Sequence, residues 1–204
     1  RLVTKNAVHI PQYGVFVTTP QVTAEEAEVS VSTEVVNQTG QLQIVSIIAE
    51  LYDPNGKSVA NNQSNLGVSV QSGQTVNLKL NLKVKHPKLW DVEKGNIYKA
   101  VISVIPDRHP QFNKIVSFGI REYKFEAKTG FWLNGKNFKV KGVCIHHDGS
   151  AFGAAVPLSV WEHRFNELRK LGANAIRTAH NPPSPEFLDL ADRMGFLVMD
   201  ELFD

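Results

Sequence analysis

ANAIRTAHNPPSPEFLDLADRMGFLVMDE, residues 173–201, is the stretch that decides the fold of the second half of the chain. It begins with ANAIRTA, a short apolar run that is typical of a strand. A helix is predicted next, because Ser184 suits the N-cap, Pro185 the first helical position and Gly195 the end of the helix. FLVMDE then forms a second strand. Two strands with a helix between them predict parallel strands joined by a helical crossover.

The same pattern begins one strand earlier in the chain. FKVKGVCI (138–145) is a strand candidate, and SVWEHRFNELRKLG follows it with helical spacing. Ser159 with Glu162 fits a capping box, and Gly172 fits the C-terminal cap. The apolar stripe of this helix consists of Trp161, Phe165, Leu168 and Leu171. From residue 138 onwards the predicted order is therefore strand, helix, strand, helix, strand.

The first 125 or so residues alternate instead between apolar and polar side chains. VNLKLNLKV (76–84) places its Val and Leu residues on one face and its Asn and Lys residues on the other, which is the period of a half-buried strand. Turn signals separate such runs at 37–41, 53–57 and 71–74. Further strand-like runs are 13–19, 29–36, 42–52, 97–105 and 114–126. Roughly seven short strands without a helical pattern predict a two-sheet sandwich of immunoglobulin type.

Composition narrows the class of protein. The chain has 204 residues, of which 42% are hydrophobic, so it can form a sizeable core. A net charge of +2 gives no electrostatic footprint for nucleic acid. The sequence contains no run of about 18 apolar residues, so no membrane-spanning helix is predicted. Cys144 is the single cysteine, which excludes an intrachain disulfide.

Polar side chains follow each predicted parallel strand. They are His146, His147 and Asp148 after the first, His180 and Asn181 after the second, and Asp200 and Glu201 at the end of the third. A dinucleotide-binding domain would need a glycine-rich turn after its first strand, and HHDGSAFGAAVP (146–157) has no GxGxxG pattern. Ligand groups at the carboxyl ends of parallel strands are typical of a (β/α)8 barrel, which needs about 250 residues. We therefore expect the first three β/α units of such a barrel.

Several stretches together resemble glycoside hydrolase family 2. They are GVCIHHDGSAFGAAVP (142–157), the stretch from Leu168 to Glu201, HPKLWD (86–91) and FGIRE (118–122). More narrowly, they are similar to the bacterial β-galactosidases of that family. The resemblance implies a multi-domain fragment: an immunoglobulin-like β-sandwich over 1–125, with 1–10 as a link from a preceding domain, and the N-terminal part of a (β/α)8 glycosidase barrel over 126–204.

The resemblance also implies an activity. The family hydrolyses terminal β-glycosides with retention, here terminal β-D-galactosides in carbohydrate catabolism, using two glutamates about 5–5.5 Å apart. In the family these follow the fourth and seventh strands, so both are expected beyond Asp204 and the chain alone is expected to be inactive. Asp200 and Glu201 do not replace them, because adjacent strand residues point to opposite faces.

The site residues that the resemblance implies hold the sugar rather than cleave it. His146 and His180 match positions that contact the sugar, and Asn181 is expected to line the same rim. Arg177 matches an arginine that supports the nucleophile, since its charge would keep that glutamate ionised. His147 and Asp148 stay open between a sugar contact and a role in shaping the loop. Trp161 is expected in the core, and Trp90 and Trp132 are open between sugar platforms and packing.

Other interpretations remain open at this point. A metal site is the rival use of His146, His147, Asp148 and His180, but their spacing matches no HExxH signature. We expect no metal or other cofactor in this part of the chain, whereas the family implies Mg²⁺ or Na⁺ in the parent enzyme.

β-Glucuronidase, β-mannosidase and a non-catalytic carbohydrate-binding or scaffold module are the alternative functions. The expected partner is a β-galactoside or related oligosaccharide, with neither nucleic acid nor membrane. A homo-oligomer and a periplasmic or cytoplasmic bacterial location stay open.

Overall fold

The computed structural model describes residues 2–64 and 67–202 and divides the chain into two compact units. The first, the sandwich unit, comprises residues 1–88 and 98–120. The second, the βα unit, comprises residues 89–97 and 121–204. The chain therefore passes from one unit to the other at 88/89, 97/98 and 120/121.

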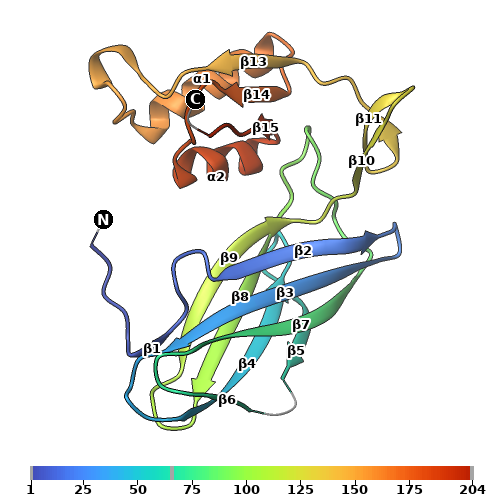
Figure 1. Cartoon of the computed structure of the whole chain (residues 1–204). Helices are drawn as coiled ribbons and strands as arrows, with labels where there is room; N and C mark the ends of the chain where they lie inside the picture. The colour runs from blue at the N-terminus through green and yellow to red at the C-terminus, as the bar shows by residue number, and fades with distance from the viewer. Residues whose placement is uncertain (1, 65–66, 203–204) are drawn as a thin grey trace. The chain divides into compact units, whose positions relative to one another are not determined.

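The sandwich unit consists of two antiparallel sheets (Figure 1). One sheet contains β1 (Val8–His9), β2 (Val15–Val22), β3 (Glu26–Asn37) and β7 (Thr75–Lys85). The other contains β4 (Gln43–Tyr52), β5 (Ser58–Gln63), β6 (Val68–Val70), β8 (Ile97–Pro106) and β9 (Phe112–Gly119). Consecutive strands are thus distributed between two sheets, as in immunoglobulin-type sandwiches.

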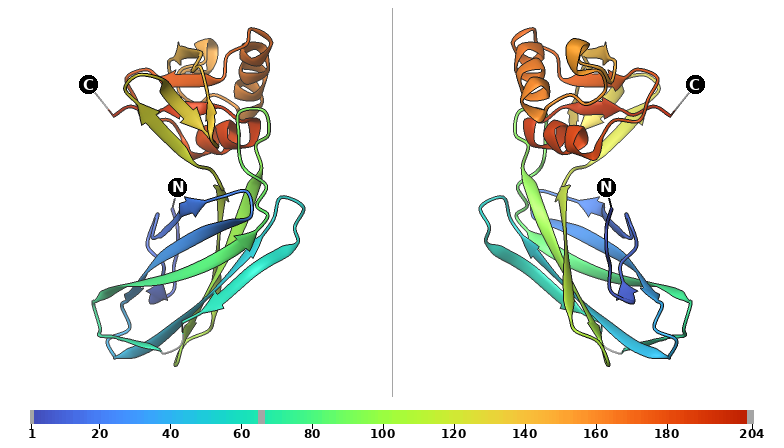
Figure 2. Two further views of the ribbon diagram at one scale, coloured as in Figure 1. Left: turned by 90° about the vertical axis from the view of Figure 1, so that its right-hand side faces the viewer. Right: turned by 90° about the vertical axis from the view of Figure 1, so that its left-hand side faces the viewer.

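The alternating sequence pattern explains the core of this unit. β3 and β7 pair with Val29 opposite Leu82 and Val31 opposite Leu80, and all four side chains are buried. The intervening residues of β7 are exposed. β4 and β8 supply the facing layer, which can be followed in the two views of Figure 2. The prediction of an all-β sandwich is confirmed.

Three strands of the sandwich unit, β1, β5 and β6, were not predicted, and the run predicted as one strand over 114–126 forms two strands. β5 (SVANNQ) and β6 (VSV) are short or polar, so they carry little alternating signal. The run 114–126 is interrupted: β9 ends at Gly119, and β10 (Tyr123–Glu126) pairs with the βα unit's hairpin instead. A single strand-like run in the sequence therefore contains two strands with different partners.

The βα unit begins with a small antiparallel sheet and continues as a parallel one (Figure 1). The antiparallel strands are β10, β11 (Gly130–Leu133) and β12 (Lys136–Asn137). The parallel strands are β13 (Gly142–Ile145), β14 (Ala175–Thr178) and β15 (Leu197–Met199), in that order across the sheet. The 3-10 helix η1 (Ser150–Phe152) and α1 (Leu158–Lys170) follow β13, and α2 (Pro185–Met194) follows β14. The described residues thus hold two complete crossovers and a third strand, not three complete β/α units.

The helices cover one face of the parallel sheet. Phe165 of α1 and Phe187 of α2 pack edge to face at 5.1 Å, and both are buried with Trp161 and Ile176. Trp161 is therefore a core residue, as predicted. Leu171 is 83% exposed and does not belong to the stripe, because the helix ends at Lys170.

The predicted helix limits are right for α2 and wrong at the start of α1. In α2, the Ser184 Oγ accepts from the Phe187 amide, Pro185 is the first residue and Gly195 has a left-handed φ of 68°. α1 starts before Ser159, because the Pro157 carbonyl already accepts from the amides of Val160 and Trp161.

The strand predicted over 138–145 is shorter in the structure, since β13 starts at Gly142. The side chain of Asn174 accepts from the Lys141 amide and donates to the Lys139 carbonyl. These bonds replace part of the backbone pairing that a longer strand would need.

The loop between β7 and β8 belongs to the βα unit, which includes residues 89–97 and residues 121–125 besides the stretch from 126 onwards. Trp90 is 1% exposed, and its Nε1 donates to the Asp192 carbonyl at 2.7 Å. Arg169 donates to the Val92 carbonyl at 2.7 Å. A Cβ at Gly195 would lie 2.8 Å from the Asp91 carbonyl oxygen. Trp90 is thus a packing residue of this unit.

Within the described residues, we find no helix whose length and hydropathy would let it cross a membrane.

Trp90→Ala is expected to destabilise the βα unit by about 3–5 kcal/mol, because it removes a buried indole and its hydrogen bond. Urea unfolding gives the loss, and hydrogen exchange locates it: β14 and β15 should lose protection while β3 and β7 keep theirs. Trp132→Ala is the matched control with a smaller expected loss of about 1 kcal/mol, since Trp132 is only half-buried. Equal losses in both variants, or loss of protection in β3 and β7, would contradict the assignment of this loop.

Candidate functional site

The register of the parallel sheet sorts its side chains onto two faces. Cys144 lies opposite Arg177, and Arg177 lies opposite Met199. Ile176 and its neighbours Ile145 and Val198 pack with the helices. Because successive strand residues point to opposite faces, Cys144, Arg177 and Met199 lie on the face away from the helices. The predicted site residues therefore follow strands whose side chains are divided between a helix-covered face and the opposite face.

Glu201 joins the second and third strands at this edge. Its Oε1 accepts from Arg177 Nε at 2.5 Å, and its Oε2 accepts from the His180 amide at 2.9 Å. Its own amide donates to Thr178 Oγ1 at 3.2 Å. Both carboxylate oxygens thus hold groups of the neighbouring β14 segment, and the two strand ends are tied together.

These bonds fix the charge of the pair. The hydrogen bond from the His180 amide and the ion pair with Arg177 lower the pKa of Glu201 below the ordinary glutamate value. The contact of Arg177 Nη1 with Cys144 Sγ at 3.6 Å, followed by Glu201, raises the pKa of Arg177. At neutral pH the carboxyl ends of β14 and β15 therefore carry an ionised carboxylate beside an ionised guanidinium.

His180 has an unusual backbone. Its φ is +68°, in the left-handed region that residues other than glycine rarely adopt. Glu201 accepts the His180 amide and so stabilises this conformation. The imidazole ring lies with its centroid 5.8 Å from that of His146, and its Nδ1 lies 3.9 Å from Glu201 Oε2. The structure therefore brings His146 and His180 together, although they are 34 positions apart in the sequence.

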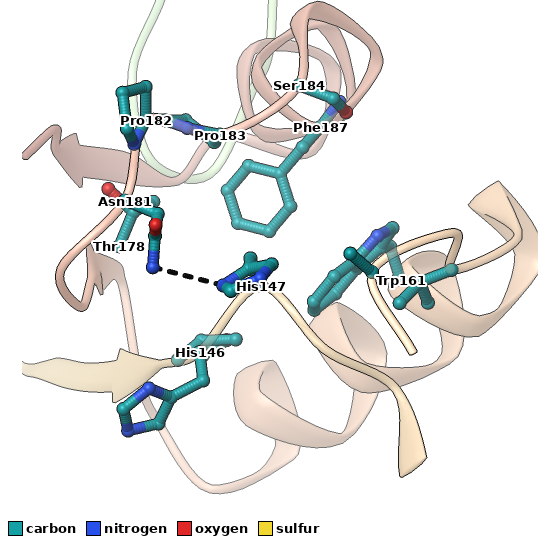
Figure 3. A pocket seen from close by; sticks show the side chains of 12 residues that line it. His146, His147, Trp161, Thr178, Asn181, Pro182, Pro183, Ser184 and Phe187 are labelled. Carbon is teal, nitrogen blue, oxygen red and sulfur yellow. Dashed lines mark hydrogen bonds between the residues drawn. The ribbon is translucent and has the colours of Figure 1, made fainter. Parts of the chain in front are cut away.

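His147 points elsewhere. Figure 3 shows its ring inside a cavity, next to Phe187 and Trp161, while the ring of His146, which also lines this cavity, points away from those two aromatic rings. The cavity has a volume of about 430 Å³. Asn181 Nδ2 lies 3.0 Å from His147 Nδ1 and forms a hydrogen bond across the two loops. Asn181 is thus placed with His147 on the helix side of the sheet, and its place on the rim of a sugar site stays a prediction.

Asp148 contributes its backbone to the loop after β13. Its carbonyl accepts from Arg164 Nη1 at 3.0 Å, and the guanidinium of Arg164 stacks over Trp161 at 4.8 Å. The Asp148 side chain is in an exposed residue. The loop is therefore anchored to α1 through its main chain.

The role of Glu201 was not predicted from the sequence, which offered it only as a replacement for a catalytic acid. In the structure Glu201 is the partner of Arg177 and His180. The signal was present: Glu201 follows the strand next to the one that carries Arg177, at the same edge of the sheet.

The site was also tested for a metal. Within 2–64 and 67–202, no three His, Cys, Asp or Glu side chains gather closely enough to hold an ion. The oxygens of Glu201 already bind Arg177 and the His180 amide.

Both halves of the chain match models of one protein family. The model of the glycosyl hydrolases family 2 matches residues 8–121, and the model of the TIM barrel domain of the same family matches residues 126–203.

The chain belongs to glycoside hydrolase family 2. Residues 8–88 and 98–120 of its sandwich unit fall within the first match, and its parallel sheet is the start of the family's TIM barrel domain.

Two named proteins and one solved structure are similar to this chain over nearly its whole length. The β-galactosidase BoGH2A of Bacteroides ovatus is 38% identical over 97% of this chain and 23% of its own length. A putative β-glucuronidase of Formosa agariphila is 36% identical over 100% of this chain and 19% of that protein. The crystal structure of a family 2 member from Bacteroides cellulosilyticus has a TM-score of 0.91 at 36% identity, over 98% of this chain and 25% of that one. The chain thus spans about a quarter or less of the length of these relatives.

Glu201→Gln is expected to lower the stability of the βα unit at neutral pH and to have little effect in acid. The pKa of Glu201 is depressed in the folded state, so its contribution is present above the unfolded value of about 4.3 and is lost as the pH falls through the folded pKa. Thermal unfolding of both proteins between about pH 7 and about pH 3 measures the difference.

Asp200→Asn is the control for this prediction, since it removes the neighbouring carboxylate from an exposed residue. A difference between wild type and Glu201→Gln that stays constant over the whole pH range would contradict the ionised pair.

Proposed function

We propose that this chain is part of a retaining β-glycosidase and that His146 and His180 hold the terminal sugar. The observation that supports the proposal is the approach of the two imidazoles, 5.8 Å apart, at the carboxyl ends of parallel strands in a TIM barrel domain. Active sites of such barrels lie at this end. Two imidazoles of this spacing suit neighbouring hydroxyl groups of one sugar ring.

The proposed chemistry uses these residues for binding and positioning. An imidazole can donate to or accept from a sugar hydroxyl, and such bonds accelerate hydrolysis when they strengthen as the ring distorts towards the oxocarbenium-like transition state. The proton donor and the nucleophile are two glutamates expected beyond Asp204. Arg177 lies on the face away from the helices, where its charge would keep a nearby carboxylate nucleophile ionised. Glu201 holds the guanidinium in place.

We propose a terminal β-D-galactoside as the substrate. BoGH2A, a named β-galactosidase, is 38% identical to this chain.

β-Glucuronidase is the second candidate. The putative β-glucuronidase of Formosa agariphila is 36% identical to this chain, almost as similar as BoGH2A. The two candidates differ in one testable respect, because a glucuronide carries a carboxylate and a galactoside does not.

In the family 2 enzyme that contains this chain, His180→Ala and His146→Ala are expected to lower kcat/KM for nitrophenyl β-galactoside by about 10²–10³. Each removes a hydrogen bond that strengthens in the transition state. His163→Ala is the matched control, because His163 is exposed on the surface of α1. Steady-state kinetics with nitrophenyl β-galactoside and β-glucuronide are compared in parallel.

Faster turnover of the glucuronide than of the galactoside would make the second candidate the function. Wild-type activity on both substrates that is unaffected by either histidine substitution would remove these residues from the sugar site. The 204-residue chain assayed alone should give no turnover, since the proposal places the proton donor and nucleophile outside it.

A further inference from the structure

One pair of neighbouring residues follows β13 and another follows β14. Within each pair, the two side chains have different partners. After β13, the His146 ring lies beside the His180 ring, whereas the His147 ring lies beside Trp161 and Phe187, in a cavity that His146 also lines (Figure 3). After β14, His180 lies beside His146, whereas Asn181 lines the same cavity as His147. The two loops therefore meet at two points: His146 lies beside His180, and His147 is hydrogen-bonded to Asn181.

The contact in the cavity is a directed hydrogen bond. An amide nitrogen only donates, so Asn181 Nδ2 donates to His147 Nδ1 over 3.0 Å. His147 then carries the proton of its neutral ring on Nε2. This bond spans the two loops, and each of its partners is covalently adjacent to one of the two histidines on the other side.

Both residues of the hydrogen bond lie next to groups with little conformational freedom. The His147 ring lies beside Trp161 and Phe187, which are 7% and 4% exposed and pack against each other edge to face at 5.1 Å. Asn181 is followed by Pro182 and Pro183, whose rings fix φ, and then by the capped start of α2. A bond between two rigid supports fixes the spacing of the loops better than one between mobile loops.

We propose that His147 and Asn181 are positioning residues, whose hydrogen bond sets the spacing of His146 and His180. The bond acts from the helix side and neither residue needs to touch the sugar. What the two histidines bind rests on the proposed function; that they are positioned by this bond does not.

The test separates the hydrogen bond from the packing of the ring. His147→Phe keeps an aromatic ring in the cavity and loses the acceptor. His147→Asn places an acceptor near the position of Nδ1 and loses the ring. Asn181→Leu keeps the size of the side chain and loses the donor. The double variant His147→Phe/Asn181→Leu completes a cycle, and His163→Asn is the control on the surface of α1.

In the family 2 enzyme that contains this chain, His147→Phe and Asn181→Leu should each raise KM for nitrophenyl β-galactoside about tenfold, with a smaller change in kcat. The double variant should be no worse than either single variant, and His147→Asn should recover most of the loss. Independent, additive losses in the double variant, or equal losses in His147→Phe and His147→Asn, would overturn the proposal.

A second measurement does not depend on activity. Imidazole signals of the ¹⁵N-labelled 204-residue chain are recorded by NMR for wild type and Asn181→Leu at one pH. The signals of His146 and His180 should shift together with that of His147. If the wild-type enzyme turns over neither glycoside but these shifts occur, the proposed function fails and the positioning stands. A shift confined to His147 in an active enzyme would overturn the positioning alone.

Discussion

The candidate site depends on one carboxylate, that of Glu201. It binds the Arg177 side chain through one oxygen and the His180 amide through the other. The first bond places a paired cation on the face away from the helices, and the second stabilises the left-handed backbone of His180. Without an acceptor at this point, an amide in a strained loop would have to be satisfied elsewhere. One side chain of the third strand thus determines the geometry at the end of the second.

Much of the fold was predictable because its signals are local. Alternation over 76–84 and the cap residues Ser184 and Gly195 act within a few positions, and the structure contains the strand and the helix that they predict. The start of α1 and the change of partner between β9 and β10 were not predictable in this way. They depend on the Pro157 carbonyl and on pairing with β11, which no short pattern encodes. The loop 89–97 is the clearest example, since Trp90 finds its partners beyond residue 120.

The site was predictable as a set of residues but not as an arrangement. The polar residues after each strand, together with the resemblance to the family, pointed to His146, His180, Asn181 and Arg177. Their partners came from the structure: Glu201 for Arg177, and His147 for Asn181. A hydrogen bond between two loops depends on where each strand ends relative to its neighbour in the sheet. These relative positions follow from the register of the sheet, which the sequence pattern does not specify.

Strand alternation alone would have separated the two histidines. Ile145 and Thr178 are register partners at the ends of β13 and β14, so His146 is one residue past its strand and His180 is two residues past its own. With continued alternation, residues one and two past the strands would point to opposite sides. The φ of +68° at His180 breaks this alternation, and its ring lies 5.8 Å from that of His146. The approach of the two rings is therefore a property of the loop conformation, and the groups that hold this conformation are the Glu201 carboxylate on one side and the His147–Asn181 bond on the other.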